Sequence, residues 1–555
     1  MNSQQEPDEH ERFQTISIAA GGKVKLGTYI NPGNVGFAEI VRSNYVDKTD
    51  LIAVLNRTIG TAQKLTCISR PRRFGKTFAA KMLCAYYDKS CDSHGLFEPY
   101  RIASDETYQQ HLNRYDVINL DITGFISSAK KKNQSLADIP NEIEKAILKE
   151  LQKTNPDLKL QDDLNECLLE RVRKTGTQLV FVIDEWDSVI REASEDKQAQ
   201  AQYLNLLRGW FKNNNFTPEA VAAAYMTGIL PIKKDGSQSA ISDFQEYTLL
   251  DPFAYAKYFG FTEEEVRKLC VLHARNFTQM KQWYDGYNVG TCHSIYNPYS
   301  VMQAIASGKY KSYWKKTSAA ETLMTYIDMN QEGLQEDIVR LIAGEFILVD
   351  TDTFKNDVET FTCKDDVLTL LIHLGYLTCK EEDGSIHVAW IPNAEIRDEF
   401  DRILRRARHS HLVELVRKSD QLLEDTIAGK SNAVAAAIQE VHETGYAPTW
   451  YNDEQSLRYV VKMAYISAVD QYARIEELPT GHGIADVVFL PKKYTRLPAI
   501  IVELKWDKTA EGAISQIKEK NYPKVLKQFG GRILLVGINY DVKTGQHTCV
   551  IEQNG

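Results

Sequence analysis

The hydrophobic and polar positions of the first half of the chain predict strands that alternate with helices. Apolar runs at 179–183 (LVFVI) and 222–226 (AAAYM) are typical of strands buried on both faces of a parallel sheet. Another short strand is expected at 116–121, and segments between these runs carry apolar residues at helical spacing. From about residue 40 to 245, this alternation predicts a doubly wound α/β domain.

The pattern changes after residue 250. Residues 251–400 are expected to be mainly helical, with a small winged-helix-like unit where 373–377 is followed by a hairpin around 381–385. Charged helices are expected over 401–445, where the basic run 402–408 fits a solvated helix face better than a nucleic-acid contact. The remaining residues show the order helix, three strands, helix, strand, which predicts a second α/β domain.

Composition limits the class of protein. At 555 residues the chain is too long for one core, so roughly three or four domains are expected. No apolar run is long enough to span a membrane, and the polar, acidic beginning lacks a signal-peptide pattern, so we expect a cytoplasmic protein without a membrane partner. Nine cysteines without a C-x-x-C pair argue against a disulfide framework and a zinc site.

Charge is unevenly distributed along the chain. The net charge is −9, yet from residue 452 onward 14 Lys and Arg face 12 Asp and Glu. A weakly basic C-terminal part on an acidic body permits local binding of phosphate groups there.

A phosphate-binding loop is predicted at 70–77 (RPRRFGKT), directly after an apolar run. Such a loop needs backbone N–H groups at a helix N-terminus, a lysine for the phosphates and a hydroxyl for Mg²⁺. Arg70 stands where the pattern G-x-x-x-x-G-K-[ST] has its first glycine, which normally eases a tight turn. The residues expected to bind nucleotide in this loop are Arg72, Arg73, Gly75, Lys76 and Thr77.

Two acidic residues follow the buried strand at 179–183, as nucleotide hydrolysis requires. Asp184 is expected to hold Mg²⁺ through water together with Thr77, and Glu185 to orient the attacking water. A solvated turn is the alternative. Thr227 ends the next apolar strand, where it could sense the γ-phosphate or simply form a turn.

The C-terminal part carries a constellation suited to metal-dependent phosphodiester cleavage. Glu503 and Lys505 are separated by one residue on an expected strand and therefore project from the same face. A turn at 490–498 can bring Asp486 beside Glu503, so that both carboxylates bind Mg²⁺, with the Leu504 carbonyl as a further ligand and Lys505 near the attacking water. The alternative is an ion pair at a sheet edge.

Three further residues are candidates for accessory roles in this second site. Glu454 lies on the helix entering the domain, as an additional carboxylate or a surface residue. Gln516 and Tyr522 follow on the next helix and could line the site or contact the nucleic-acid backbone.

These segments resemble two families. The N-terminal two-thirds is similar to the bacterial AAA-ATPase-like family, whose loop usually has the form Arg-Pro-Arg-Arg-Phe-Gly-Lys, and the C-terminal part resembles its companion PD-(D/E)XK nuclease domain. Where such families show Gly-Arg-Ala-Asp, this chain has Gly483-Ile484-Ala485-Asp486, which puts contacts with substrate in doubt but keeps the carboxylate. The matching segments are 45–52, 70–77, 183–187, 227–228, 283–287, 296–300, 313–314, 373–378, 391–396, 485–486, 502–505 and 516–517.

The resemblance implies an ATP- and Mg²⁺-dependent ATPase coupled to a nuclease that cleaves DNA, less so RNA, in defence or mobile-element biology; a homo-oligomer is left open. The rival interpretation is a nucleotide-controlled switch whose nuclease-like domain holds nucleic acid or a partner without cutting. A third makes the ATPase a binding scaffold that gates the nuclease. The expected organisation is a polar N-terminal extension (1–40), a P-loop AAA-like domain (41–250), a helical lid with the winged-helix-like region (251–400), a helical linker (401–445) and a restriction-endonuclease-like domain (446–555).

Overall fold

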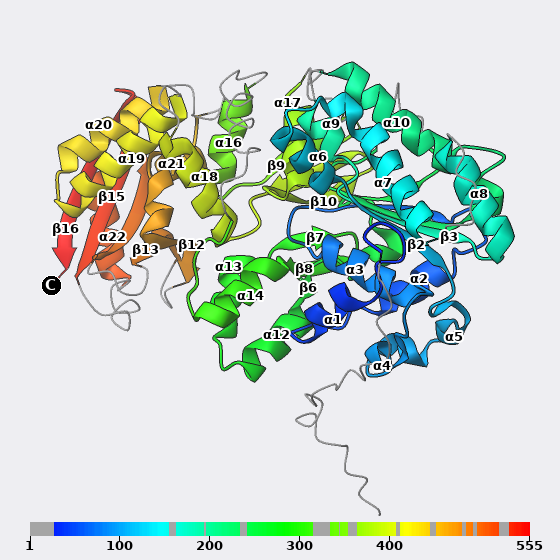
Figure 1. Cartoon of the computed structure of the whole chain (residues 1–555). Coiled ribbons are helices and arrows are strands. Elements are labelled where there is room, and N and C mark those ends of the chain that lie inside the picture. The colour runs from blue at the N-terminus through cyan, green and yellow to red at the C-terminus, as the bar shows by residue number, and fades with distance from the viewer. Residues whose placement is uncertain are drawn as a thin grey trace, which may run out of the picture. The chain divides into compact units, whose positions relative to one another are not determined.

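The computed structural model describes most of the chain (Figure 1). The described residues are 27–154, 163–193, 196–232, 241–314, 333–342, 344–352, 354, 363–406, 411–443, 451–479, 484–491, 497–520 and 532–554. They divide into two compact units, described separately below. Unit 1 comprises Met1–Lys64, Phe78–Asp184 and Gly209–Tyr225, and unit 2 comprises Leu65–Thr77, Glu185–Arg208 and Met226–Gly555.

Unit 1 is built around strands of a parallel sheet. Strand β2 (Asp116–Asp121) pairs in parallel with β3 (Leu179–Asp184), and β4 (Val221–Gly228), which continues into unit 2, follows β3 in the sheet order. All six residues of β3 are buried, as the run of five apolar residues predicts for a strand covered on both faces. The helices of unit 1 are α1 (Val35–Val41), α2 (Asp50–Asn56), most of α3 (Lys76–Tyr87), α4 (His94–Phe97), α5 (Tyr108–His111), α6 (Ile122–Lys131), α7 (Ile139–Thr154), α8 (Leu164–Thr175) and α11 (Thr217–Ala220).

Local sequence explains where several of these helices begin and end. The Asp121 carboxylate at the end of β2 accepts the Gly124 N–H and so caps α6, while Asp163 caps α8 in the same way. Helix α8 ends at Gly176, whose φ of 65° is left-handed backbone that glycine adopts without steric cost. The predicted alternation of strands and helices is confirmed in this unit.

The first part of unit 2 continues the sheet. Strand β1 (Leu65–Ser69) lies between β4 and β5 (Gln245–Tyr247), with which it pairs in parallel, so the whole order is β2-β3-β4-β1-β5. Helices α9 (Ser188–Glu192) and α10 (Lys197–Phe211) come after β3 along the chain. A doubly wound P-loop domain is therefore present, and the loop after β1 leads directly into α3.

The middle region contains more strands than the predicted mainly helical arrangement. Helices α12 (Glu263–Leu272), α13 (Phe277–Tyr284) and α14 (Pro298–Ser307) accompany a small sheet of order β6-β8-β7 (Phe261–Thr262, Cys292–Tyr296, Tyr287–Val289). The succession α16 (Leu334–Ile342), β9 (Ile347–Asp350), α17 (Lys364–Leu374), β10 (Thr378–Asp383) and β11 (Ile386–Trp390) has sheet order β10-β11-β9, which is the predicted winged-helix-like unit with its hairpin. Helices α18 (Ala394–Arg406), α19 (His411–Ile427) and α20 (Ser431–Val441) follow.

The C-terminal domain is a five-stranded mixed sheet of order β12-β13-β14-β15-β16, which includes one more strand than the sequence pattern predicts. Only β14 and β15 pair in parallel, and β14 is the central strand. Helix α22 packs on one face, where Ile514 and Ile517 contact Ile501 of β14 within one apolar cluster. The elements are α21 (Glu454–Ala464), β12 (Tyr472–Pro479), β13 (Ile484–Pro491), β14 (Ala499–Trp506), α22 (Ala510–Glu519), β15 (Ile533–Asp541) and β16 (Gln546–Asn554).

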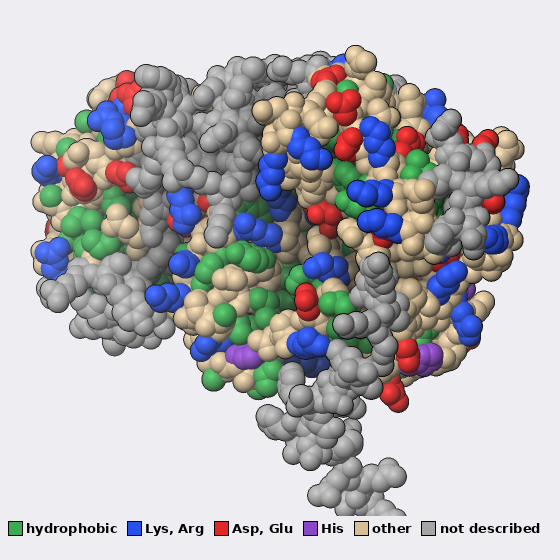
Figure 2. Space-filling view, in the orientation of Figure 1, with side chains coloured by type: hydrophobic (Ala, Val, Ile, Leu, Met, Phe, Trp, Pro, Cys, Tyr) green, Lys and Arg blue, Asp and Glu red, His purple; other side chains and the backbone are tan. Residues whose placement is uncertain are grey.

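Three expectations from composition can be compared with the described residues. All nine cysteines are free thiols, as expected for a chain without a disulfide framework. Among the described helices, none combines the length and the apolar character that a membrane span requires. On the face shown in Figure 2, basic and acidic side chains are interspersed over the described surface.

Candidate functional site

The predicted phosphate loop places its lysine in a buried position at the start of α3. The Lys76 side chain is 3% exposed, and its Nζ donates to the carbonyl oxygens of Arg70 (3.0 Å) and Pro71 (3.2 Å). The same Nζ lies 3.5 Å from Oε1 of Glu185. The structure therefore brings together the lysine and the acidic residue that the sequence assigns to phosphate binding and water activation.

Arg70 replaces the expected first glycine of the loop without a steric conflict. Its φ is negative, and the left-handed backbone falls instead on Arg73 (φ 70°) and Gly75 (φ 94°). The Arg70 guanidinium is buried and donates to the carbonyls of Ser69 (2.9 Å) and Tyr247 (2.8 Å), while its N–H donates to the Gly228 carbonyl. Arg70 thus anchors the loop to the strands beside it, and conformational freedom is needed at other positions.

Glu185 is held in an unusual backbone conformation next to Lys76. Its φ is 55°, which is uncommon for a residue with a side chain and is typical of functional sites whose surroundings enforce it. The surroundings are visible: Glu185 N–H donates to the Thr227 hydroxyl (3.2 Å), and Trp186 N–H donates to the Thr227 carbonyl (2.8 Å). Thr227 is fully buried, so in this structure it positions Glu185; its contact with a γ-phosphate stays a prediction.

An ion-pair network behind Glu185 was not predicted. Nη2 of Arg191 donates to Oε2 of Glu185 and its Nε to Oδ2 of Asp187, each at 2.9 Å. Burial alone would lower the pKa of Arg191, but the carboxylates of Asp187 and Glu185 outweigh burial and raise it. Asp187 also accepts the N–H groups of Ile229 and Leu230, so it ties the acidic turn to the end of β4. The i, i+4 spacing of Asp187 and Arg191 was the sequence signal for this network.

The remaining nucleotide candidates occupy different surroundings. Thr77 is exposed at the N-terminus of α3, and Asp184 is buried at the end of β3 in unit 1, so their sharing of one Mg²⁺ stays a prediction. The Arg73 guanidinium lies 4.5 Å from the centre of the Tyr299 ring and donates to the Tyr313 carbonyl (2.8 Å). Arg72 is half-buried, and its carbonyl accepts from the Asn297 amide (3.5 Å).

A buried carboxylate, Glu395, underlies the segment that Arg73 contacts. Glu395 is 1% exposed, and its Oε1 accepts from the Tyr313 N–H (2.7 Å) and the Ser300 hydroxyl (2.9 Å). Burial raises the pKa of Glu395 to about 7, although these hydrogen bonds and the charge of Arg73 oppose the rise. The protonation of Glu395 is therefore coupled to folding near neutral pH.

Glu395→Gln is expected to change how stability depends on pH. A carboxyl whose pKa is higher in the folded than in the unfolded chain loses stabilisation as pH rises from about 4.5 to about 7, because the folded state must release the proton at a cost. The amide keeps the acceptor oxygen and has no proton to release. Between about pH 5 and 7 the variant should therefore gain on the order of 2–3 kcal/mol relative to the wild type, measured by urea unfolding. The exposed Glu382→Gln should follow the wild type throughout, and parallel curves for Glu395→Gln would contradict the assignment.

The candidate nuclease residues Glu503 and Lys505 lie on the central strand β14, both buried. Nζ of Lys505 is 3.3 Å from Oε1 of Glu503 and donates to the Leu504 carbonyl (2.9 Å). The Gln516 side-chain amide, projecting from α22, also donates to Oε1 of Glu503. Because β14 has paired neighbours on both sides, the alternative of an ion pair at a sheet edge is wrong.

Asp486 lies beside this pair, as predicted, while residues 492–496 of the turn expected to bring it there lie outside the described residues. Its Oδ2 accepts the Leu504 N–H (2.8 Å), and its Oδ1 accepts from Nη2 of Arg458 on α21 (2.9 Å). Burial, and next the charge of Asp486, raise the pKa of Glu503 to about 7, partly offset by Lys505. A buried carboxyl next to a second negative charge is an arrangement that a bound cation relieves.

The residues present fit a bound divalent cation. Oε2 of Glu503 is buried and has no hydrogen-bond partner among the residues that the structure describes, and an orphaned carboxylate oxygen of this kind is costly unless something else binds it. With Asp486 and the Leu504 carbonyl, the donors are all oxygen, which suits Mg²⁺ completed by water. Within the described part of the chain no cluster of three or more His, Cys, Asp or Glu side chains offers a metal site, so this one would use two carboxylates and a carbonyl.

Of the three accessory candidates, the structure shows Gln516 in contact with the nuclease site. Gln516 contacts Glu503, as proposed, whereas Glu454 is the first residue of α21 and Arg458, one turn later, makes the contact with Asp486. Tyr522 lies outside the described residues. Sequence reasoning missed Arg458 because nothing in the segment distinguishes it from a solvated helix residue.

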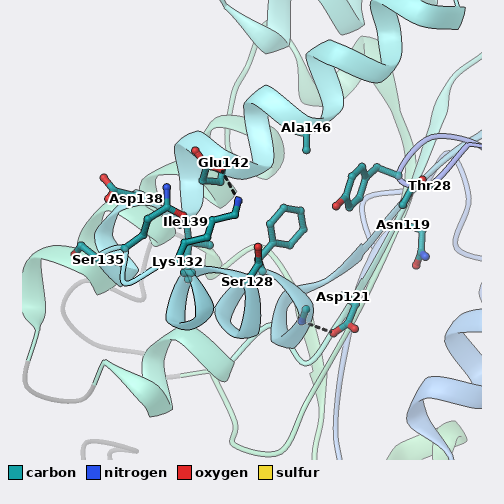
Figure 3. A pocket seen from close by; sticks show the side chains of 15 residues that line it. Thr28, Asn119, Asp121, Ser128, Lys132, Ser135, Asp138, Ile139, Glu142 and Ala146 are labelled. Atoms are coloured by element: carbon teal, nitrogen blue, oxygen red, sulfur yellow. Dashed lines mark hydrogen bonds and ion pairs between the residues drawn. The ribbon is translucent and has the colours of Figure 1, made fainter.

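A separate cavity of about 470 Å³ lies in unit 1 (Figure 3). It is bordered by α6, α7 and the segment at Thr28, with Asp121, Lys132 and Glu142 among its polar side chains. Lys132 and Glu142 pair with each other across it at 3.9 Å. None of the residues predicted for either site is among those described as lining it, so its polar lining adds nothing to either mechanism.

The parallel sheet, the loop after β1 and the mixed C-terminal sheet have the form of a P-loop ATPase domain followed by a nuclease-type α/β domain. In agreement, residues 33–237 match the family model described as predicted AAA-ATPase, and residues 452–549 match that of the PD-(D/E)XK nuclease superfamily. Both matches lie where the resemblance placed the two domains. No curated protein is similar enough in sequence to match.

Among solved structures, the chain is similar to the Aeropyrum pernix ORC2 protein in its ADPNP–ADP complexes. The two share 11% sequence identity over 65% of this chain and 96% of that chain, with a TM-score of 0.32. The class assigned above therefore rests on the family matches, the sheet order and the loop geometry.

Proposed function

We propose that this protein is a Mg²⁺-dependent nuclease that cleaves phosphodiester bonds of DNA under the control of ATP bound at its P-loop. The observation that carries the proposal is that Asp486 on one strand accepts the Leu504 N–H of the adjacent strand, between the paired Glu503 and Lys505, and that one Glu503 oxygen has no partner among the described residues. The nuclease-superfamily match supports a nucleic-acid substrate, and our choice of DNA over RNA follows the family resemblance.

The residues of the nuclease site would have separate roles in hydrolysis. Asp486, Glu503 and the Leu504 carbonyl would hold Mg²⁺, which when bound acts as a Lewis acid and lowers the pKa of water. The Lys505 ammonium contacts Glu503 and the Leu504 carbonyl, and it would orient the attacking water or stabilise charge on the phosphate. Gln516 restrains the Glu503 carboxylate from the helix side.

Some residues of the ATP site would bind the nucleotide, and others would take part in its hydrolysis. Lys76 and Gly75 would bind the phosphates, with Arg72, Arg73 and Thr227 in supporting contacts, and Thr77 and Asp184 would hold Mg²⁺. Glu185, held by Thr227 and Arg191, would orient the hydrolytic water. We further propose a cytoplasmic location and leave self-association to experiment.

Cleavage of supercoiled plasmid and of single-stranded DNA, with Mg²⁺ and with or without ATP, tests the proposal. We expect cleavage that a chelator abolishes, that ATP changes, and that Asp486→Asn lowers by at least about 100-fold because a metal ligand is lost. The exposed Glu519→Gln on α22 is the matched control and should cleave normally. Absence of cleavage with any divalent cation, while DNA is still bound, would favour the nucleotide-controlled switch that binds without cutting.

A further inference from the structure

Arg458 reaches the carboxylate of the nuclease site from a different element. It lies in the middle of α21, its side chain is 21% exposed, and its Nη2 donates to Oδ1 of Asp486 at 2.9 Å. The residue is therefore at once part of the buried cluster and within reach of solvent.

The two oxygens of Asp486 are held by unequal donors. Oδ2 accepts a backbone N–H of the central strand, which cannot move without breaking the sheet. Oδ1 is held by the end of a long side chain, which can change rotamer. A divalent cation that binds Oδ1 meets the positive guanidinium at the same oxygen, so the two are in competition for Asp486.

The net charge of the site indicates what the displaced Arg458 guanidinium would bind. Asp486 and Glu503 lie beside Lys505 and Arg458, and Lys520 also acts on Glu503, so a divalent cation added to this cluster makes it positive. A positive cluster open to solvent attracts a phosphodiester, and the planar guanidinium matches the paired oxygens of a phosphate. Because α21 fixes the backbone of Arg458, a displaced guanidinium remains within a side chain's length of its present position.

We propose that Arg458 is the phosphodiester-binding residue of the nuclease site, stored on Asp486 in the absence of a cation and released to the substrate when a divalent cation takes its place. This inference rests on the proposed nuclease function and adds to it a residue that binds substrate and resists the cation. Arg458 thus has opposite effects on the two ligands.

Arg458→Gln is expected to strengthen cation binding and weaken DNA binding in the full-length protein. Mg²⁺ affinity, measured by isothermal titration calorimetry without DNA, should rise about tenfold because the cation no longer displaces a charge-assisted hydrogen bond. Affinity for a short fluorescein-labelled DNA duplex in Ca²⁺, measured by anisotropy, should fall about tenfold because a phosphate contact is lost. Arg458→Lys, which keeps the charge but not the fork, should lie between wild type and Gln in both measurements.

Other outcomes separate the failure of this inference from that of the proposed function. Weaker binding of both ligands by Arg458→Gln would show a structural role and overturn the inference, as would no change in either or a change in only one. Arg173→Gln, which breaks an exposed pair with Glu219, is the matched control for charge and should change neither affinity. If Asp486→Asn, made without any other substitution, binds Mg²⁺ as tightly as the wild type does, the proposed metal site is wrong, and with it the proposed function.

Discussion

Lys505→Ala should lower the rate of DNA cleavage by about 100- to 1,000-fold while leaving ATP binding intact. The ammonium is buried, lies 3.3 Å from Glu503 and donates to the Leu504 carbonyl, so its position is fixed beside two of the three proposed metal ligands. A preorganised charge in a site shielded from water contributes this much to a transition state that gains negative charge. Single-turnover cleavage of plasmid at saturating Mg²⁺ measures the effect, and a fluorescent ATP analogue measures nucleotide binding.

The control for this experiment lies three residues away. Lys508 is exposed just beyond the end of β14, so Lys508→Ala removes the same charge from the same part of the chain without touching the cluster. Glu503→Ala should reduce cleavage as strongly as Lys505→Ala, because it removes a carboxylate ligand. Undiminished cleavage by both variants would show that the reaction takes place elsewhere.

Glu185→Gln should slow ATP hydrolysis by about 100- to 1,000-fold with little loss of ATP affinity. The amide oxygen of the substituted side chain can still accept from Arg191. The contact with the Thr227 hydroxyl uses only the backbone N–H of residue 185, so the strained turn is retained. The carboxylate that would orient and polarise the attacking water is lost, which is an effect on the reaction and not on binding. Release of phosphate at saturating ATP gives the rate, and equilibrium binding of ATP gives the affinity.

Two companion variants make this result specific. Glu192→Gln removes an exposed acidic residue from the same turn of α9 and should hydrolyse ATP normally. Lys76→Ala should lose binding and hydrolysis together, because it removes the buried ammonium that we expect to bind the phosphates. If Glu185→Gln still cleaves DNA in the presence of ATP, nucleotide binding alone controls the nuclease; hydrolysis unaffected by Glu185→Gln would reject Glu185 as the catalytic carboxylate.

Much of the fold could be predicted because its signals are local. The buried strands β3 and β4 are continuous apolar runs, and the period of two along β14 places Glu503 and Lys505 on one face. Strand β16 was missed because its sequence, QHTCVIEQN, has three apolar residues between two polar triplets, so this edge strand shows neither an alternating pattern nor a long apolar run. The strands of the middle region are two to six residues long, too short for a periodic pattern to develop.

The parts of the sites that escaped prediction are contacts between distant residues. Arg458 is 28 positions from Asp486, and Glu395 is 82 positions from Tyr313, so no spacing rule connects them. At Arg70 the opposite happened. The phosphate-loop pattern calls for a glycine at this position, but the structure has left-handed backbone at Arg73 and Gly75 instead, so an arginine is accommodated. Motif spacing identifies residues that share a strand or a turn, whereas partners supplied by another element require coordinates.

The turn that holds Glu185 also supplies a spectroscopic probe. Trp186 is fully buried, and its indole nitrogen lies so close to Gly228 that a Cβ added there would meet it at 2.7 Å. Any movement of the Glu185 turn relative to the end of β4 must therefore change the surroundings of this indole. With the other six of the seven tryptophans replaced by phenylalanine, the emission of Trp186 would follow nucleotide binding in real time, without a label and independently of DNA cleavage.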